Sequence, residues 1–169
     1  MKRTITMLLA AVMLFGICAI SCGAAKVVLS KQKLSVDGVV AKCESYNIDG
    51  SNYFKLRDIA MLLNGTQAQF SVKWNEKKQT ISLQTEKPYT AVGGELEIGS
   101  DKSATAQESK TTLLVNGNEV TSLTAYNIGG NTYFKLRELG NLLYFDVSYN
   151  AVANIAAVES FTFQGCEKP

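Results

Sequence analysis

Few residues in this chain have the types and spacing needed for acid-base or nucleophilic chemistry. Two arginines stand directly before a carboxylate, at Arg57-Asp58 and at Arg137-Glu138. Neither pair has a nucleophile or a partner base beside it in the sequence, so acid-base catalysis is disfavoured. We predict instead that each arginine opens a helix and braces a turn through charge-assisted hydrogen bonds. Lys55 and Lys135 are expected to face solvent.

The composition excludes several kinds of catalytic and metal site. The 169 residues include no histidine, which removes Ser-His-Asp and Cys-His catalysis and histidine-ligated zinc or copper. Lys plus Arg is 17 against 15 acids, and loss of Lys2 and Arg3 with the leader described below leaves 15 against 15. Nucleic-acid-binding proteins usually carry a basic excess, so we predict no nucleic-acid partner. No cofactor and no enzyme activity are expected.

Aromatic residues are the other candidates for a site. Their flat apolar faces and polar edges could form a stacking surface for sugars. Core packing is the favoured interpretation, because alternating positions on short strands must fill a small core. Trp74 and Tyr149 are the expected exceptions and are the candidate binding-surface aromatics. The set comprises Tyr53, Phe54, Phe70 and Trp74, with Tyr133, Phe134, Phe145 and Tyr149.

The N-terminal segment has the pattern of a secretory signal peptide. Lys2 and Arg3 precede an uncharged apolar run over residues 5–20, and small residues follow over 21–25. A retained membrane anchor is the alternative, although the run is short for a bilayer span. Two cleavage reactions fit: residues 19–22 resemble a bacterial lipobox, which would leave a lipidated Cys22 as the N-terminus, whereas ordinary signal peptidase would cut before Lys26. Export is predicted on either branch, to the cell envelope or beyond.

Two cysteines, Cys43 and Cys166, remain in the part that should fold. Outside the cytoplasm a disulfide between them is permitted. The alternative is two unpaired thiols in a reducing habitat, and the sequence does not choose between them. A two-cysteine metal site is disfavoured because no histidine is present to complete it.

The chain repeats itself. Residues 46–63 match residues 126–143 at 11 of 18 positions, at an offset of 80. The match resumes between 70–75 and 145–150 at an offset of 75, so the second copy has lost five residues in between. Self-similarity of this length indicates a duplication, and the length difference belongs in a surface loop.

Each copy predicts the same series of elements. Hairpin turns are expected at Asp37-Gly38 and Asn116-Gly117, and further turns at Asp49-Gly50 and Gly129-Gly130. A helix follows in each copy, with an apolar face at helical spacing. A strand, a turn and a last strand over 80–83 complete the first copy, whereas four alanines between 151 and 157 predict a weak last strand in the second. The helix faces are Leu56, Ile59, Ala60 and Leu63, and Leu136, Leu139, Gly140 and Leu143.

This series predicts an α+β fold of two tandem repeats, each an antiparallel sheet wrapped around one helix. The boundaries are a signal peptide over 1–25, a first repeat over 26–87, a linker over 88–111, and a second repeat with its tail over 112–169. Residues 92–98 of the linker could add an edge strand to the first repeat. Each copy has only about 50 to 60 residues, a size at which a lone core is marginal, so the two could pack into one body.

The repeated segment, Tyr-Asn-Ile-x-Gly-x-x-Tyr-Phe-Lys-Leu-Arg-Asp/Glu, resembles the copper amine oxidase N-terminal-like domain, also called the stalk domain. The resemblance covers nearly all of the mature chain in two copies. It implies a small antiparallel sheet about a helix and a bacterial, exported, cell-envelope protein. In the oxidases the copper lies in a separate domain with histidine ligands, so the resemblance does not imply oxidase activity here. Its motif residues are Tyr53, Phe54, Leu56, Arg57 and Asp58, with Tyr133, Phe134, Leu136, Arg137 and Glu138.

Two functions follow as hypotheses. The first is a non-catalytic envelope module that acts as a spacer or binds a protein or a wall glycan, with a membrane contact only through a lipid on Cys22. The second is a secreted accessory or inhibitor protein that acts on a partner hydrolase.

We expect the mature protein to show no amine oxidase activity and to bind copper no better than a variant that lacks Cys43 and Cys166, because it has no histidine ligand. Isothermal titration with copper measures the copper binding of both proteins. Tight binding that survives replacement of both cysteines would contradict the prediction.

Overall fold

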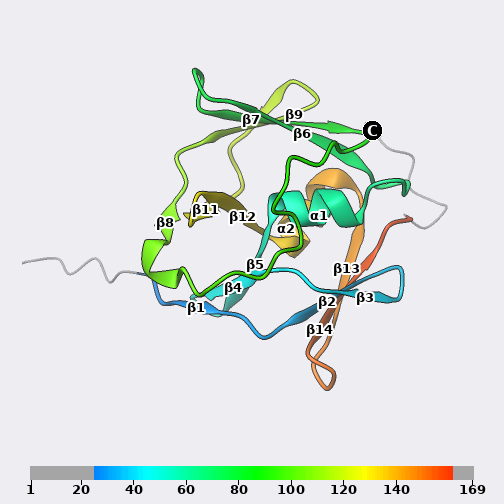
Figure 1. The fold of residues 1–169 in the computed structure, drawn as a ribbon. Coiled ribbons are helices and arrows are strands. Elements are labelled where there is room, and N and C mark those ends of the chain that lie inside the picture. The colour runs from blue at the N-terminus through cyan, green and yellow to red at the C-terminus, as the bar shows by residue number, and fades with distance from the viewer. Residues whose placement is uncertain (1–24, 162–169) are drawn as a thin grey trace, which may run out of the picture.

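The computed structural model describes residues 25–161, which form an α+β protein of three sheets and two short α-helices (Figure 1). The predictions about the leader, about Cys22 and about a disulfide to Cys166 fall outside the described residues. Within residues 25–161, no helix has the length and hydrophobicity needed to cross a membrane.

The elements of the first half are β1 (Val27–Leu29), β2 (Lys33–Val36), β3 (Val39–Ala41), β4 (Ser45–Ile48), β5 (Ser51–Lys55), α1 (Leu56–Leu62), β6 (Phe70–Asn75) and β7 (Thr80–Thr85). Those of the second half are the 3₁₀ turn η1 (Ser103–Thr105), β8 (Gln107–Glu108), β9 (Thr112–Val115), β10 (Asn118–Val120), β11 (Ala125–Ile128), β12 (Asn131–Lys135), α2 (Leu136–Leu143), β13 (Asp146–Asn150) and β14 (Ile155–Glu159).

The hairpin turns form where the sequence places Asp-Gly and Asn-Gly. Both residues of Asp37-Gly38 have positive φ, at 49° and 81°, and those of Asn116-Gly117 are at 51° and 88°. Two consecutive left-handed residues match the right-handed twist of the flanking strands, which explains the tight β2–β3 and β9–β10 hairpins. The predicted turns are confirmed.

The two helices bury the faces that their spacing predicts. Leu56, Ile59 and Ala60 of α1 and the following Leu63 are buried, as are the four corresponding residues of α2. The five-residue deletion shortens the exit from α2, where Tyr144 adopts a left-handed cap and the N–H of Phe145 returns to the carbonyl of Gly140 at 3.0 Å. A Cβ on Gly140 would lie 2.6 Å from the carbonyl oxygen of Phe145, so this position needs glycine.

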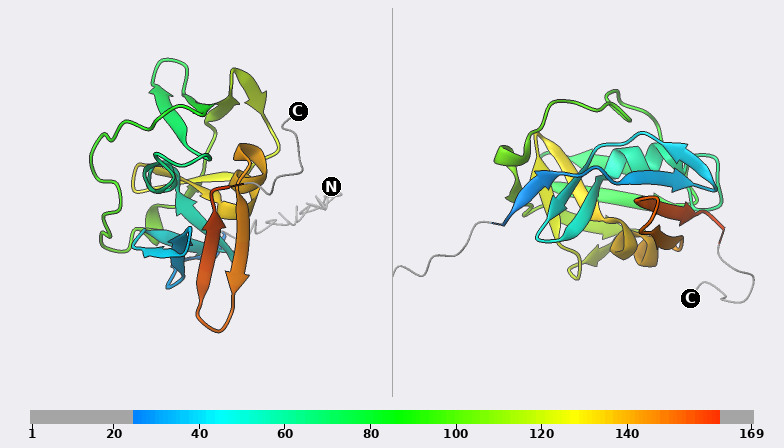
Figure 2. Two further views of the ribbon diagram at one scale, coloured as in Figure 1. Left: turned by 90° about the vertical axis from the view of Figure 1, so that its right-hand side faces the viewer. Right: turned by 90° about the horizontal axis from the view of Figure 1, so that it is seen from below.

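The sheets are shared between the two halves of the chain. The central sheet has the order β1-β4-β5-β12-β11-β8, the upper sheet β10-β9-β7-β6 and the lower sheet β13-β14-β2-β3. Each therefore contains strands from both halves, and one separate sheet per repeat is not what the structure contains. A unit of about 50 to 60 residues has only a marginal core when alone, which favours pairing across the halves. In Figure 2 the red end of the chain, β14, lies beside the blue strand β2.

Corresponding strands pair in corresponding registers. At the centre, antiparallel β5 and β12 place Phe54 opposite Phe134. The upper sheet pairs β7 with β9 in parallel, Ile81 opposite Leu113, and the lower sheet pairs β14 with β2 in parallel, Ala156 opposite Leu34. The expectation of a weak last strand is wrong, because β14 has a partner on each side.

The segment over 88–111 is held against the first half by hydrogen bonds. The N–H of Leu96 donates to Asp58 Oδ1 at 2.9 Å, and the N–H of Gly99 donates to Glu44 Oε2 at 3.1 Å. Residues 92–98 form no strand, so the predicted edge strand is wrong there: Gly93 and Gly94 have positive φ, and carboxylates accept the amide protons. The strand that this segment does contribute is β8, which pairs with β11 at one edge of the central sheet.

The main core lies between the sheets and around both helices, and it draws on every sheet. Phe54, Phe134, Leu56 and Leu136 all belong to it. A smaller cluster of Tyr46, Ile48, Tyr53, Ile128 and Tyr133 belongs to the central sheet. Because the main core is continuous, the two halves should unfold together.

We expect Leu56→Ala and Leu136→Ala each to lower the free energy of unfolding by about 2 to 5 kcal/mol, because each leaves a cavity in the shared core. Urea unfolding followed both by fluorescence of Trp74, the single tryptophan, and by circular dichroism should give one coincident transition. The fully exposed Val152→Ala serves as the control and should change stability by less than about 0.5 kcal/mol. Two separate transitions would contradict the shared core.

Candidate functional site

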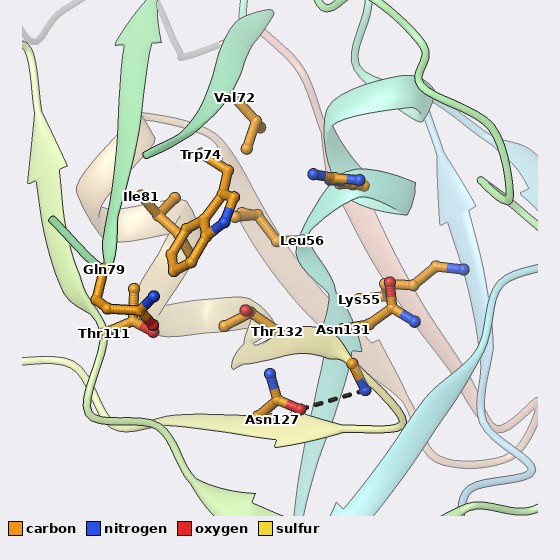
Figure 3. Close-up of a pocket in the computed structure, with 12 residues that line it drawn as sticks. Lys55, Leu56, Val72, Trp74, Gln79, Ile81, Thr111, Asn127, Asn131 and Thr132 are labelled. Atoms are coloured by element: carbon orange, nitrogen blue, oxygen red, sulfur yellow. Dashed lines mark hydrogen bonds between the residues drawn. The ribbon is translucent and has the colours of Figure 1, made fainter. Parts of the chain in front are cut away.

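A groove opens between the upper sheet, the start of α1 and the β11–β12 turn. Its volume is about 210 Å³, and we call it the first groove. Its walls come from three separate parts of the chain, so no single local segment forms the groove. The lining residues are Lys55, Leu56, Arg57, Val72, Trp74, Gln79, Ile81, Thr111, Asn127, Gly130, Asn131 and Thr132 (Figure 3).

Trp74 provides the apolar wall of the first groove. It lies on β6 opposite Ile81 of β7, and its side chain is 44% exposed. In Figure 3 the indole lies close to Ile81 and Leu56, with Asn127 and Thr132 across the opening. One face of a large aromatic ring is therefore available to a ligand.

The opposite wall is polar and comes from the second half of the chain. The N–H of Gly130 donates to Asn127 Oδ1 at 3.2 Å, which closes the left-handed Gly129-Gly130 turn. Among residues 25–161 three side-chain groups on this wall have no hydrogen-bond partner: the nitrogen Nδ2 of Asn127, the amide of Asn131 and the hydroxyl of Thr132. These groups are free to bind a polar ligand.

Arg57 lines the groove and does not brace a turn. In the described part of the chain its guanidinium forms no hydrogen bond and no ion pair. The carboxylates pair with lysines instead: Lys55 Nζ lies 3.0 Å from Asp58 Oδ1. At the start of a helix, residues i and i+3 lie on one face whereas i and i+1 do not, so Asp58 meets the N-cap residue Lys55 and not Arg57.

The second half shows the same pairing of a carboxylate with a lysine. Lys135 Nζ lies 3.0 Å from Glu138 Oε1 at a part-exposed position, and Arg137 is exposed without a hydrogen bond or ion pair among the described residues. Lys55, by contrast, is only 5% exposed, so the expectation that it faces solvent is wrong. Its ammonium also donates to the carbonyl of Gly94 at 2.8 Å.

The buried groups beside α1 form a structural network. Burial raises the pKa of Asp58, and the N–H of Leu96 and the Lys55 ammonium partly offset that effect. Burial, and next the charge of Asp58, raises the pKa of the part-buried Cys43 to about 12, so its thiol stays protonated at neutral pH. Tyr133 donates its hydroxyl to the buried Glu44, and burial raises the pKa of that phenol. The network holds residues 94–99 in place.

A second groove, of about 530 Å³, lies between the lower sheet, the start of α2 and the β4–β5 turn. Its exposed aromatic residue is Tyr149, at 52%, whereas Phe54, which also lines it, is buried. The amides on its polar wall bond to one another: Asn47 Nδ2 donates to Asn52 Oδ1 at 2.9 Å, and Asn52 Nδ2 donates to Gln32 Oε1 at 2.9 Å. The lining residues are Gln32, Asn47, Gly50, Ser51, Asn52, Phe54, Lys135, Leu136, Arg137, Val147, Ser148, Tyr149 and Ala156.

The structure divides the sequence candidates between the two grooves. Trp74 joins Arg57 in the first groove and Tyr149 joins Arg137 in the second, so the two candidate binding-surface aromatics do not share a site. The motif aromatics are buried, namely Tyr53, Phe54, Tyr133 and Phe134. Within the described residues, no cluster of three or more Cys, Asp or Glu side chains is arranged to hold a metal ion.

Sequence reasoning missed the polar wall of the first groove. Asn127 lies inside the repeated motif, and Asn131 and Thr132 follow its turn, so a signal was present. We interpreted it only as turn chemistry, because nothing in the sequence places this turn beside Trp74, more than 50 residues earlier.

No protein-family model, curated protein or solved structure matches this chain. The resemblance to the copper amine oxidase N-terminal-like domain therefore stays a prediction, and the geometry of the grooves carries the argument about function.

We expect Lys55→Met to lower the free energy of unfolding by about 3 to 5 kcal/mol at neutral pH, because it leaves the fully buried Asp58 carboxylate unpaired. Lys135→Met, at the corresponding part-exposed pair, should cost less than about 1 kcal/mol. Burial raises the pKa of Asp58, so the loss in Lys55→Met should shrink as the pH falls and this carboxyl takes up a proton. Urea titrations between neutral and acidic pH measure it, and equal losses in both variants would contradict it.

Proposed function

We propose that the protein is a non-catalytic, exported module of the bacterial cell envelope that binds wall glycan through the first groove. The single observation that carries this proposal is the exposed face of Trp74 opposite unpartnered polar groups. A passive spacer would not require this arrangement.

The chemistry of the groove matches a sugar ring. A pyranose has an apolar face of C–H groups that can stack on an indole, and hydroxyls around its edge that need hydrogen-bond partners. Asn127, Asn131 and Thr132 offer such partners across from the indole. Pockets for drug-sized ligands usually have about 300 to 1,000 Å³, so a groove of about 210 Å³ fits a single small unit.

Arg57 favours an acidic glycan. A guanidinium binds a carboxylate or a phosphate through two parallel hydrogen bonds, and Arg57 has no acidic partner in the part of the chain that the structure describes. The other cation of the groove, Lys55, is neutralised by Asp58. The groove is therefore matched to a sugar that carries one negative group.

We also propose that the two halves are copies of one stalk-like unit that have exchanged their hairpins. The repeated motif, the one helix in each half and the matching registers of the upper and lower sheets support this. Export rests on the signal-peptide pattern, and tethering to the membrane would require lipidation of Cys22.

The second hypothesis, an accessory or inhibitor of a partner hydrolase, has support from one surface. Val39 and Val40 are exposed on β3, which is an edge strand of the lower sheet. An exposed apolar edge can pair with a strand of another protein.

We expect purified mature protein to co-sediment with bacterial wall sacculi. Trp74→Ala should weaken this binding at least about tenfold, because a tryptophan that becomes buried on binding typically contributes about 2 kcal/mol or more. Arg57→Gln should weaken binding and reduce its dependence on salt concentration. Trp74→Phe keeps a ring and should retain part of the affinity.

Phe161→Ala is the matched control, because Phe161 is an exposed aromatic that lines neither groove. It should bind as the unaltered protein does. Failure of the unaltered protein to sediment with any wall preparation would overturn the proposal, and so would equal losses in Trp74→Ala and Phe161→Ala.

A further inference from the structure

The two grooves are built from corresponding residues of the sequence repeat. Tyr149 occupies the position of Trp74, at the offset of 75, and Arg137 that of Arg57, at the offset of 80. Asn47 stands where Asn127 does, again 80 residues apart. In each groove the aromatic and the arginine come from one half and the asparagine from the other.

Strand pairing explains why the second groove repeats the first. The centre of the β5–β12 pair places Phe54 opposite Phe134, so each helix start lies beside the turn that belongs to the other half. The β6–β7 and β13–β14 hairpins then supply one aromatic each, from the upper and the lower sheet. In Figure 1 these two sheets lie on opposite sides of the helices, so the two grooves do not compete for one opening.

The second groove differs from the first in how many of its polar groups are free. Asn47, Asn52 and Gln32 bond to one another, and the Tyr149 hydroxyl donates to Asn154 Oδ1 at 3.2 Å. A ligand must replace some of these bonds, and a phenol ring offers less stacking area than an indole. Arg137, however, is exposed and has no acidic partner among the described residues, as in the first groove.

We infer that the second groove is a second and weaker site for an acidic sugar, so that one molecule holds two units of a repeating acidic glycan at once. This inference rests on the proposed function of the first groove. Two linked sites raise the affinity for a polymer without any new contact, provided that the polymer can span them.

Titration with soluble fragments measures the affinity of each site separately. We would titrate the full chain with the disaccharide of N-acetylglucosamine and N-acetylmuramic acid, which carries a carboxylate, and with N-acetylglucosamine 1-phosphate, which carries a phosphate. The fragment of matching chemistry should bind with two sites per molecule. Tyr149→Ala should leave one tight site, and Trp74→Ala should leave one weak site whose binding shifts the amide NMR signals of residues 47–52.

Binding to the polymer measures how much affinity is gained by linking the two sites. On intact wall glycan the unaltered protein should bind at least about 100-fold more tightly than Tyr149→Ala, within the gain of about 10² to 10⁴ that linked sites provide. Tyr149→Phe, which keeps the ring, should retain most of that gain. Urea unfolding of each variant establishes that the loss arises at the site and not from a change in folding.

The outcomes separate the two proposals. Absence of binding by the unaltered protein to every fragment and to the wall would overturn the proposed function and this inference with it. One site per molecule, with Tyr149→Ala and Arg137→Gln both neutral on fragment and polymer, would overturn the second site alone and leave the first groove standing.

Discussion

The antiparallel pairing of β5 with β12 is the contact on which the rest of the structure depends. It sets Phe54 directly opposite Phe134, both buried in the main core. Each strand continues without a loop into its helix, at Leu56 and at Leu136. The pairing therefore decides where both helices begin, and it brings the arginine that follows each helix start close to the turn of the opposite half.

Sharing of the outer sheets follows from the same constraint. A unit of one helix and a few short strands buries apolar surface that only marginally offsets its loss of conformational entropy. The halves solve this by pairing β7 with β9 and β14 with β2, so that one core serves the whole body. The grooves are a consequence, because each one lies where a hairpin from one half meets a turn from the other.

Similar sequence motifs then take on different physical roles. Lys55 and Asp58 are enclosed by the segment over 88–111, which adds a backbone acceptor at Gly94 and a donor at Leu96. Lys135 and Glu138 form the same i and i+3 pair near the surface. The covering segment thus makes one pair a buried support and leaves the other half-exposed, although the two motifs are nearly identical in sequence.

Local chemistry was readable from the sequence. The Asp-Gly and Asn-Gly pairs specified hairpin turns, and apolar spacing specified both helix faces. These properties depend on backbone preferences and on periodicity within a few residues, so no distant part of the chain is needed to decide them.

Partnership across the chain was decided only by the tertiary structure. The pairing of strands from both halves in each sheet, the role of the 88–111 segment and the pairing of Asp58 with Lys55 instead of a neighbouring arginine all depend on which surfaces meet. The same is true of the first groove, where Trp74 faces Asn127 from the other half. A duplicated sequence is compatible with pairing within a copy or between copies, and only the burial of a shared core selects between them.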